Sequence, residues 1–205
     1  MNLEKNKIAF ANAIKKCSEL LPVFFWALLI FGVDDGDMAV MTIISALIHE
    51  AGHIGYISIA KKVRPTLKGV MSGFRIGCVG GLSYDQEIKM YLAGPAVNVI
   101  SFLLCSFVSR PFGLDMSLFA AINLATAISN LLPIKGYDGY GIIRAYITKN
   151  EYGEIAIKAL SLVSTGLIFI LCILSLYFIN RFGGGYWIFF VFFFSMLKHF
   201  KEDFG

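Results

Sequence analysis

Residues 38–60 read MAVMTIISALIHEAGHIGYISIA, an apolar stretch that carries His49, Glu50 and His53 near its middle. A helix that spans a bilayer needs about 20 predominantly apolar residues, so this stretch predicts a membrane helix. Ionisable side chains inside such a helix are costly and by default mark a functional site. The stretch therefore predicts a membrane protein and also where its chemistry lies.

The composition of the whole chain agrees with this interpretation. Of the 205 residues, 57% are hydrophobic and 16% are charged, whereas soluble proteins average about 45–50% and 25%. The net charge of +4 is spread between the apolar runs and forms no basic face, so no nucleic-acid partner is expected. The composition excludes a soluble enzyme and a disordered chain. A disulfide framework or zinc ribbon is not expected either, because no CxxC pair occurs among Cys17, Cys78, Cys105 and Cys172.

Further uncharged runs cover residues 90–109, 116–134, 159–180 and 182–197. The fold class that we expect is an all-α polytopic membrane protein. It has about six transmembrane helices, near residues 17–33, 38–60, 88–109, 116–134, 155–180 and 184–199. No small-residue cleavage site follows the first run, which predicts an uncleaved span rather than a signal peptide. The first and last runs are also short enough to be interfacial helices.

The basic residues predict the orientation in the membrane, because cytoplasmic loops collect Lys and Arg. If both termini are cytoplasmic, Arg110 and Arg181 are the only basic residues outside, and the rest of the 18 Lys and Arg lie on the cytoplasmic side or next to it. We therefore expect a multi-pass integral membrane protein with both termini in the cytoplasm.

A glycine-rich segment separates the second and third expected spans. Five glycines occur among residues 69–82, with β-branched and aromatic residues between them. This pattern disfavours a helix and predicts a short membrane-associated β-hairpin. Non-helical backbone at membrane depth is tolerated only where protein covers it or where it lines a wet cavity, so we expect a cavity nearby. No appended soluble domain is evident, so residues 1–205 are expected to form a single membrane-embedded domain.

The motif His49-Glu50-Ala51-Gly52-His53 predicts a metal site. On a helix, His49 and His53 lie one turn apart on the same face, so both imidazoles can bind one metal ion. Glu50 can then reach a water on the metal rather than the metal itself. The alternative is a buried cluster of these three side chains held by hydrogen bonds alone.

A catalytic zinc site usually has three protein ligands, so two histidines need a partner. Asp138 is the best placed, because Pro133 and the following glycines interrupt the expected span where it reaches the cytoplasmic side. The break also offers water a route, which puts the opening of the active site on the cytoplasmic side. Asp138 could alternatively be a solvated loop residue. The other acidic candidates are Asp85, Glu87, Glu151 and Glu154.

At this point the sequence resembles a known family. The motifs are HEAGH at residues 49–53, AGPAVN at 93–98, and NLLP at 130–133 followed by Asp138-Gly139. Together with the glycine-rich segment they resemble the site-2 protease family of intramembrane zinc metalloproteases. The resemblance covers about residues 42–144, half of the chain. Tyr140 departs from it, because many members have a second glycine after Asp-Gly.

The resemblance implies one Zn²⁺ per chain on His49, His53 and Asp138, with Glu50 as the catalytic residue that activates water. It places the catalytic core of the metalloprotease domain at about residues 38–144, in a minimal form without PDZ or CBS domains. It also makes the cell membrane of a prokaryote the expected location.

Two asparagines on apolar runs are candidate substrate-binding residues. The amides of Asn98 and Asn130 can donate hydrogen bonds to a substrate carbonyl or to the oxyanion that develops on it. Packing contacts between helices are the alternative role, since polar side chains in membranes often provide them.

The expected function is hydrolysis of a peptide bond in or near a transmembrane segment of a membrane-bound substrate. The expected partners are a transmembrane or membrane-anchored protein substrate and the lipid bilayer. A regulatory membrane protein and a homo-oligomer are left open. One alternative is another membrane HExxH protease, with Glu151 or Glu154 as third ligand. The other is a non-enzymatic metal transporter.

Overall fold

The computed structural model describes residues 36–61, 66–70, 73–77, 81–108, 110–182 and 193. The expected spans near residues 17–33 and 184–199 lie outside these residues, apart from residue 193, so they stay predictions. The described part is mostly helical.

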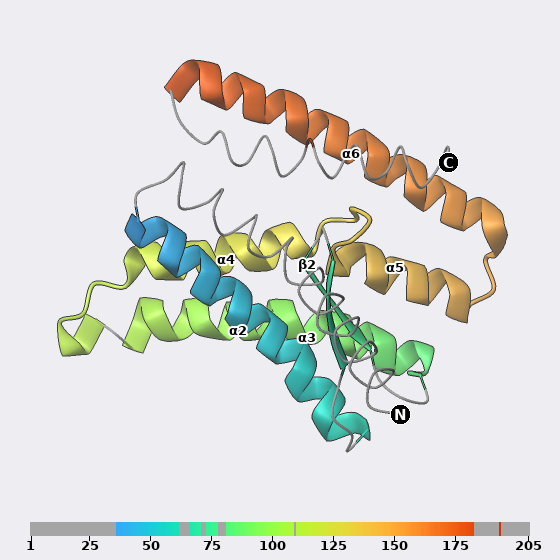
Figure 1. The fold of residues 1–205 in the computed structure, drawn as a ribbon, viewed down its shortest axis with the longest axis horizontal. Coiled ribbons are helices and arrows are strands. Elements are labelled where there is room, and N and C mark those ends of the chain that lie inside the picture. Colours follow the sequence, from blue (N-terminus) through green and yellow to red (C-terminus); the bar gives the residue numbers. More distant parts are fainter. Residues whose placement is uncertain are drawn as a thin grey trace, which may run out of the picture.

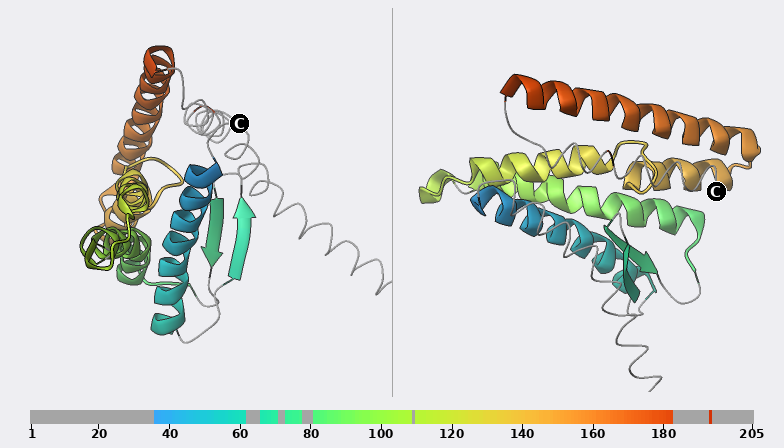
Figure 2. Two further views of the ribbon diagram at one scale, coloured as in Figure 1. Left: turned by 90° about the vertical axis from the view of Figure 1, so that its left-hand side faces the viewer. Right: turned by 45° about the horizontal axis from the view of Figure 1, so that its top comes forward.

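The elements follow one another as α2, β1, β2, α3, η1, η2, α4, α5 and α6. Their bounds are Gly36–Lys61, Thr66–Val70, Gly73–Gly77, Tyr84–Leu103, Leu104–Val108, Arg110–Phe112, Ser117–Asn130, Asp138–Lys149 and Gly153–Phe182. The short η1 is a π-helix and η2 is a 3₁₀-helix. Helix α3 is central, because it packs against α2, α4 and α5 (Figure 1). Helix α6 contacts α5 and runs along the side of the bundle away from α2 (Figure 2).

Three described helices are long and apolar enough to cross a membrane. Their candidate spans are Val40–Ala60, Tyr84–Phe107 and Gly153–Arg181, which correspond to the expected spans 38–60, 88–109 and 155–180. The expected span at 116–134 is represented by α4, an apolar helix of 14 residues. Helix α4 ends at Asn130, before Pro133, which fits the exclusion of proline from helix interiors. The count of six spans stays a prediction.

Helix α3 begins earlier than the apolar run suggests, because a capping box defines its first turn. The Ser83 hydroxyl accepts a hydrogen bond from the Gln86 backbone N–H, and the Gln86 side chain accepts one from the Ser83 N–H. Each contact satisfies a backbone donor that the helix itself leaves unpaired. Polar residues therefore extend α3 beyond its apolar part.

Two short strands, β1 and β2, overlap the glycine-rich segment, although β1 begins three residues before it. They pair antiparallel, with Thr66 opposite Gly77 and Val70 opposite Gly73. The strands lie beside α2, and β2 contacts this helix (Figure 2). That they are associated with the membrane stays a prediction.

Helix α5, Asp138–Lys149, lies between the expected spans at 116–134 and 155–180 and is not predicted from the sequence. The chain between α4 and α5 is held against α6. The Lys135 backbone N–H donates to the Ser164 hydroxyl at 2.8 Å, and the fully buried Ile134 packs against Ile168 and Cys172. In the first turn of α5, Tyr140 is 8% exposed and packs against Leu160 of α6. Helix α6 therefore fixes the segment that leads into α5.

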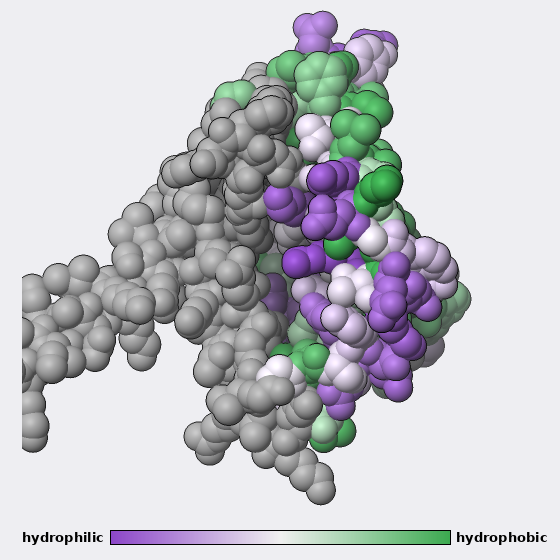
Figure 3. Space-filling model, turned by 90° about the vertical axis from the view of Figure 1, so that its right-hand side faces the viewer, coloured by the Kyte–Doolittle hydropathy of each residue, from purple (hydrophilic) through white to green (hydrophobic). Residues whose placement is uncertain are grey.

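The end of the molecule at which α3 begins and α5 meets α6 is hydrophilic (Figure 3). Lys149 of α5 forms an ion pair with Asp85 of α3, with Nζ 2.6 Å from Oδ1. By contrast, α6 exposes many large apolar side chains, among them Leu162 and Phe169. A charged end next to an apolar helix surface suits a chain that leaves the membrane at this end.

Candidate metal centre

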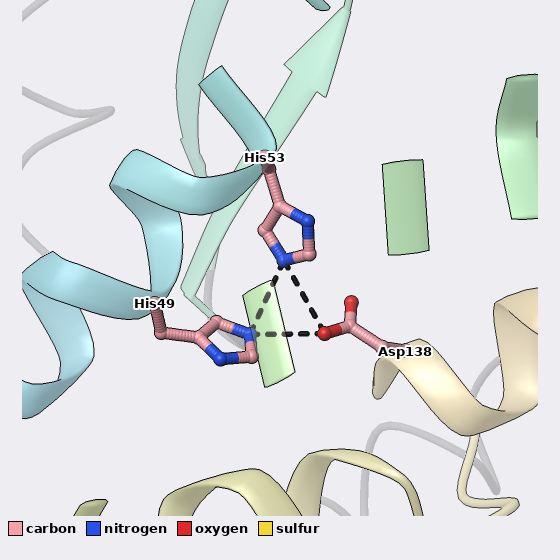
Figure 4. A group of neighbouring side chains, drawn as sticks. All are labelled: His49, His53 and Asp138. Atoms are coloured by element: carbon pink, nitrogen blue, oxygen red, sulfur yellow. Dashed lines mark hydrogen bonds and ion pairs between the residues drawn. The ribbon is translucent and has the colours of Figure 1, made fainter. Parts of the chain in front are cut away.

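Two histidines of α2 face the interior of the bundle. His49 and His53 are each 5% exposed, and their Nε2 atoms lie 3.2 Å apart (Figure 4). A separation of four residues places both on one face of the helix. The two imidazoles therefore lie side by side, as the four-residue spacing in HEAGH predicts.

Asp138 completes the group from the first turn of α5. Its Oδ2 lies 2.9 Å from Nε2 of His49 and 3.3 Å from Nε2 of His53 (Figure 4). Among the residues that the structure describes, these three form the one cluster of potential ligands, with the ligand atoms within 4.8 Å of one another. Burial raises the pKa of Asp138, but the two imidazoles, when they are protonated, lower it by more through charge and hydrogen bonding, so its pKa lies below the usual value. An ionised carboxylate is the form that a metal ligand requires.

Glycines let the backbone approach the cluster closely. A Cβ added at Gly94 of α3 would lie 2.5 Å from Nε2 of His53 and 2.8 Å from Cε1 of His49. A Cβ at Gly139 would clash with the backbone of Leu131. Glycine is thus required at position 94, where α3 contacts the imidazoles, and at position 139, next to Asp138.

The hydrogen bonds at Nδ1 determine which ring nitrogens are free. Nδ1 of His53 lies 2.7 Å from the Met90 carbonyl oxygen, and Nδ1 of His49 lies 2.7 Å from Oδ1 of Asn98. Both partners are acceptors, so Nδ1 is the protonated nitrogen of each ring, and in a neutral imidazole Nε2 then presents a lone pair.

With both imidazoles neutral, the centre of the cluster lacks a positive charge. Two Nε2 lone pairs and Oδ2 of Asp138 converge, and this buried oxygen receives no hydrogen bond in the described structure. Three acceptors at this separation repel one another unless a cation lies between them. Two imidazoles and one carboxylate are a donor set that suits zinc and leaves a fourth position open. The residues present therefore fit a zinc ion.

Glu50 lies next to His49 on α2 and is half-buried. It interacts electrostatically with both histidines and with Asp138, but it is not among the clustered ligand atoms. Glu50 therefore lies beside the cluster and outside it, and its role as the base stays a prediction.

The two candidate substrate-binding asparagines have different surroundings. Asn98 is 0% exposed and hydrogen-bonds to His49, Ser45 and Asn123. Asn130 is half-buried at the end of α4, where its amide donates to the Thr126 carbonyl at 2.9 Å. The structure brings Asn98 to His49, and contact of either asparagine with substrate stays a prediction.

Sequence reasoning missed the partners of Asn98. Asn123 of α4 and Ser45 of α2 are both 0% exposed, and both bond to the Asn98 amide. The available signal is an amide side chain inside an uncharged apolar run, a feature that Asn123 shares with Asn98 and Asn130.

The alternative acidic ligands lie elsewhere. Asp85 pairs with Lys149, and the Glu154 side chain is 89% exposed beside Lys158. Glu151 is exposed and adopts a positive φ of 55° between α5 and α6. Glu87 is half-buried in the first turn of α3. None of the four belongs to the cluster of described residues at His49 and His53.

Comparison with solved structures shows what kind of protein carries this fold. The chain is similar to the Site-2 Protease from Methanocaldococcus jannaschii, with a TM-score of 0.65 and 20% sequence identity. The similarity covers 89% of this chain and 88% of that one. No family model matches the sequence, and no curated protein matches it. The fold is therefore that of a site-2 protease, in agreement with the resemblance seen in the motifs.

Proposed function

We propose that this chain is a membrane-embedded zinc metalloprotease of the site-2 protease type. Its substrate is a transmembrane or membrane-anchored protein, and the bond that it hydrolyses lies in or near the membrane segment. The observation that carries this proposal is the convergence of three buried acceptor atoms from His49, His53 and Asp138, with Glu50 beside them. The shared fold supports the same class.

The four side chains divide into three metal ligands and one general base. His49, His53 and Asp138 would hold a zinc ion, which when bound would supply Lewis-acid chemistry to the scissile carbonyl and to a water molecule. Glu50 removes a proton from the attacking water as its oxygen bonds to the carbonyl carbon. When the C–N bond breaks, Glu50 passes that proton to the leaving amine, so one water is consumed for each bond cleaved.

The location of the centre favours a membrane substrate. His49 and His53 belong to the candidate span Val40–Ala60, so a scissile bond must reach them at membrane depth. A transmembrane helix hides its peptide groups in hydrogen bonds, so the substrate must unwind locally before attack. The β1–β2 pair offers strand edges to which unwound chain could add. We propose that residues 1–205 act as one membrane-embedded domain in a prokaryotic cell membrane, with the active site open to the cytoplasm.

The two alternatives have less support. A protease with Glu as third ligand would need Glu151 or Glu154 at the centre, but both are exposed and outside the cluster. A metal transporter would need ionisable residues along several spans. In the middle of α2 lie His49, Glu50 and His53. The charged residues of the other two described spans lie near the ends of α3 and α6, namely Asp85, Glu87, Lys89, Glu154, Lys158 and Arg181.

The experiment that tests the proposal compares membranes containing the wild type with membranes containing Glu50→Gln. Glu50→Gln keeps the side-chain shape but removes the base. Quantitative proteomics should find one or more membrane proteins that accumulate uncleaved in the variant and are shortened in the wild type. Glu154→Gln, a change at an exposed carboxylate, is the matched control and should resemble the wild type. Identical fragment patterns in wild type and Glu50→Gln would refute proteolysis through this site.

A further inference from the structure

A network of buried polar side chains lies against the metal centre. Its members are Ser45 of α2, Asn98 of α3, and Asn123 and Thr126 of α4, which we call the amide network. Ser45, Asn98 and Asn123 are 0% exposed. Buried amides in apolar helices are costly unless their donors and acceptors are satisfied, so their mutual orientation is tightly specified.

A backbone carbonyl fixes the orientation of the Asn98 amide. Nδ2 of Asn98 lies 3.1 Å from the carbonyl oxygen of Ser45. A carbonyl oxygen only accepts, so the amide nitrogen must point toward Ser45 and Oδ1 must point toward Nδ1 of His49, 2.7 Å away. His49 therefore donates from Nδ1 and keeps its lone pair on Nε2.

A second carbonyl fixes Asn123 in the same way. Nδ2 of Asn123 donates to the Phe119 carbonyl at 2.9 Å, which leaves Oδ1 facing the amide nitrogen of Asn98 at 2.9 Å. The Ser45 hydroxyl lies 3.2 Å from the same Oδ1. The hydrogen bonds thus fix the orientation of both amide groups. Turning either amide by 180° would place its oxygen against a carbonyl oxygen.

We propose that Asn98 and Asn123 are positioning residues that set the tautomer and ring orientation of His49, so that Nε2 faces the metal. Asn98 acts directly on His49, and Asn123 acts through Asn98. His53 needs no such network, because its Nδ1 bonds to the Met90 backbone carbonyl. The inference rests on the metal site of the proposed function and adds a role for α4, which supplies no metal ligand.

The first test measures zinc affinity of the full chain in detergent, by competition with a chromophoric chelator. Loss of an outer partner of a ligating histidine typically costs about 10- to 100-fold in metal affinity. We expect Asn98→Leu to fall in this range and Asn123→Leu to lower affinity by less. Ser175→Ala is the control, because this buried hydroxyl on α6 bonds to the Cys172 carbonyl within its own helix. It should leave zinc affinity unchanged.

The second test uses the symmetry of a carboxylate. In Asn98→Asp either oxygen can accept from Nδ1 of His49, so no neighbour is needed to select the correct end. Asn98→Asp keeps an acceptor for Nδ1 of His49, but its second oxygen faces the Ser45 carbonyl oxygen and Oδ1 of Asn123. We therefore expect it to bind zinc more tightly than Asn98→Leu and more weakly than the wild type. Asn123→Leu should cause no further loss in that background, although it weakens binding when Asn98 is present. A role of Asn123 in packing alone predicts the same loss in both backgrounds.

The outcomes separate this inference from the proposed function. A wild type that binds no zinc refutes the proposed metal site itself. A wild type that binds zinc, together with a folded Asn98→Leu of equal affinity, overturns the positioning role alone. If Asn98→Leu fails to fold, the comparison of Asn123→Leu in the Asn98 and Asn98→Asp backgrounds decides, and equal losses in both overturn the inference. The absorption spectrum of bound Co²⁺ provides a second readout, since it reports ligand geometry without activity.

Discussion

Gly94 of α3 lies directly against the imidazole of His53: a Cβ added there would be 2.5 Å from Nε2. Real Cβ atoms do not approach a ring nitrogen so closely, and hydrogen bonds at Nδ1 hold both imidazoles in place. Gly94→Ala should therefore displace the rings and lower zinc affinity by at least about 10-fold, as other disturbances of ligand orientation do. Chelator competition measures this effect.

A control for Gly94→Ala is available on α2. No described atom lies within 4 Å of a Cβ added at Gly55, so Gly55→Ala should leave zinc binding unchanged. Wild-type affinity in Gly94→Ala would show that the rings can move aside without losing the ion.

Glu50→Gln separates chemistry from binding. Glu50 lies outside the cluster of ligand atoms, so the variant should keep its zinc. Loss of a general base typically costs about 10²- to 10⁴-fold in rate, and we expect a loss of this size in cleavage of any substrate that the proteomic comparison identifies. Zinc content and cleavage are measured on the same preparation. Loss of zinc from Glu50→Gln would instead mark Glu50 as a ligand.

Tyr140 anchors the helix that carries Asp138. It is 8% exposed and packs against Leu160 of α6 and Ile147 of α5. Tyr140→Ala should lower the free energy of unfolding by about 3 kcal/mol, the range for removal of a large buried ring. Thermal unfolding in detergent is the measurement, with Tyr152→Ala, at a 59% exposed position, as the control. Equal unfolding midpoints for the two variants would argue against the anchor.

The topology can be tested with reporter fusions. From the distribution of basic residues we expect residues 61–68 and 145–150 in the cytoplasm. We expect residues 34–37, 110–115 and 181–185 on the opposite side. A cytoplasmic signal from a fusion at 110–115 would contradict the predicted spans and the side from which water enters.

The sequence predicts much of the centre because helix periodicity is a local property. A separation of four residues suffices to predict that His49 and His53 share a face, and Pro133 indicates where the chain turns toward them. The same local rules mislead at α5, because Gly139 and Gly141 resemble helix breakers. In the structure, a Cβ at Gly139 would meet the Leu131 backbone and one at Gly141 would meet the Tyr91 ring. Tertiary packing demands these glycines and outweighs their low helix propensity.

The amide network could not be predicted in the same way. Asn98 and Asn123 come from different helices, and their contact depends on how α3 packs against α4. No spacing rule links positions on two helices, because the pairing follows from rotation and offset of each helix. The structure also accounts for Tyr140, where the family resemblance leads one to expect glycine, since its ring fills the contact between α5 and α6.

The central claim is that His49, His53 and Asp138 together hold one catalytic metal ion. Its most direct test is the zinc content, by mass spectrometry, of purified wild type, Asp138→Ala, Glu151→Gln and Glu154→Gln. If these three side chains are the ligands, the wild type and both glutamate variants should hold about one zinc per chain. The same assignment predicts less than about a tenth of that content in Asp138→Ala, which loses one of the three ligands. Full zinc content in Asp138→Ala, or its loss in either glutamate variant, would contradict the account.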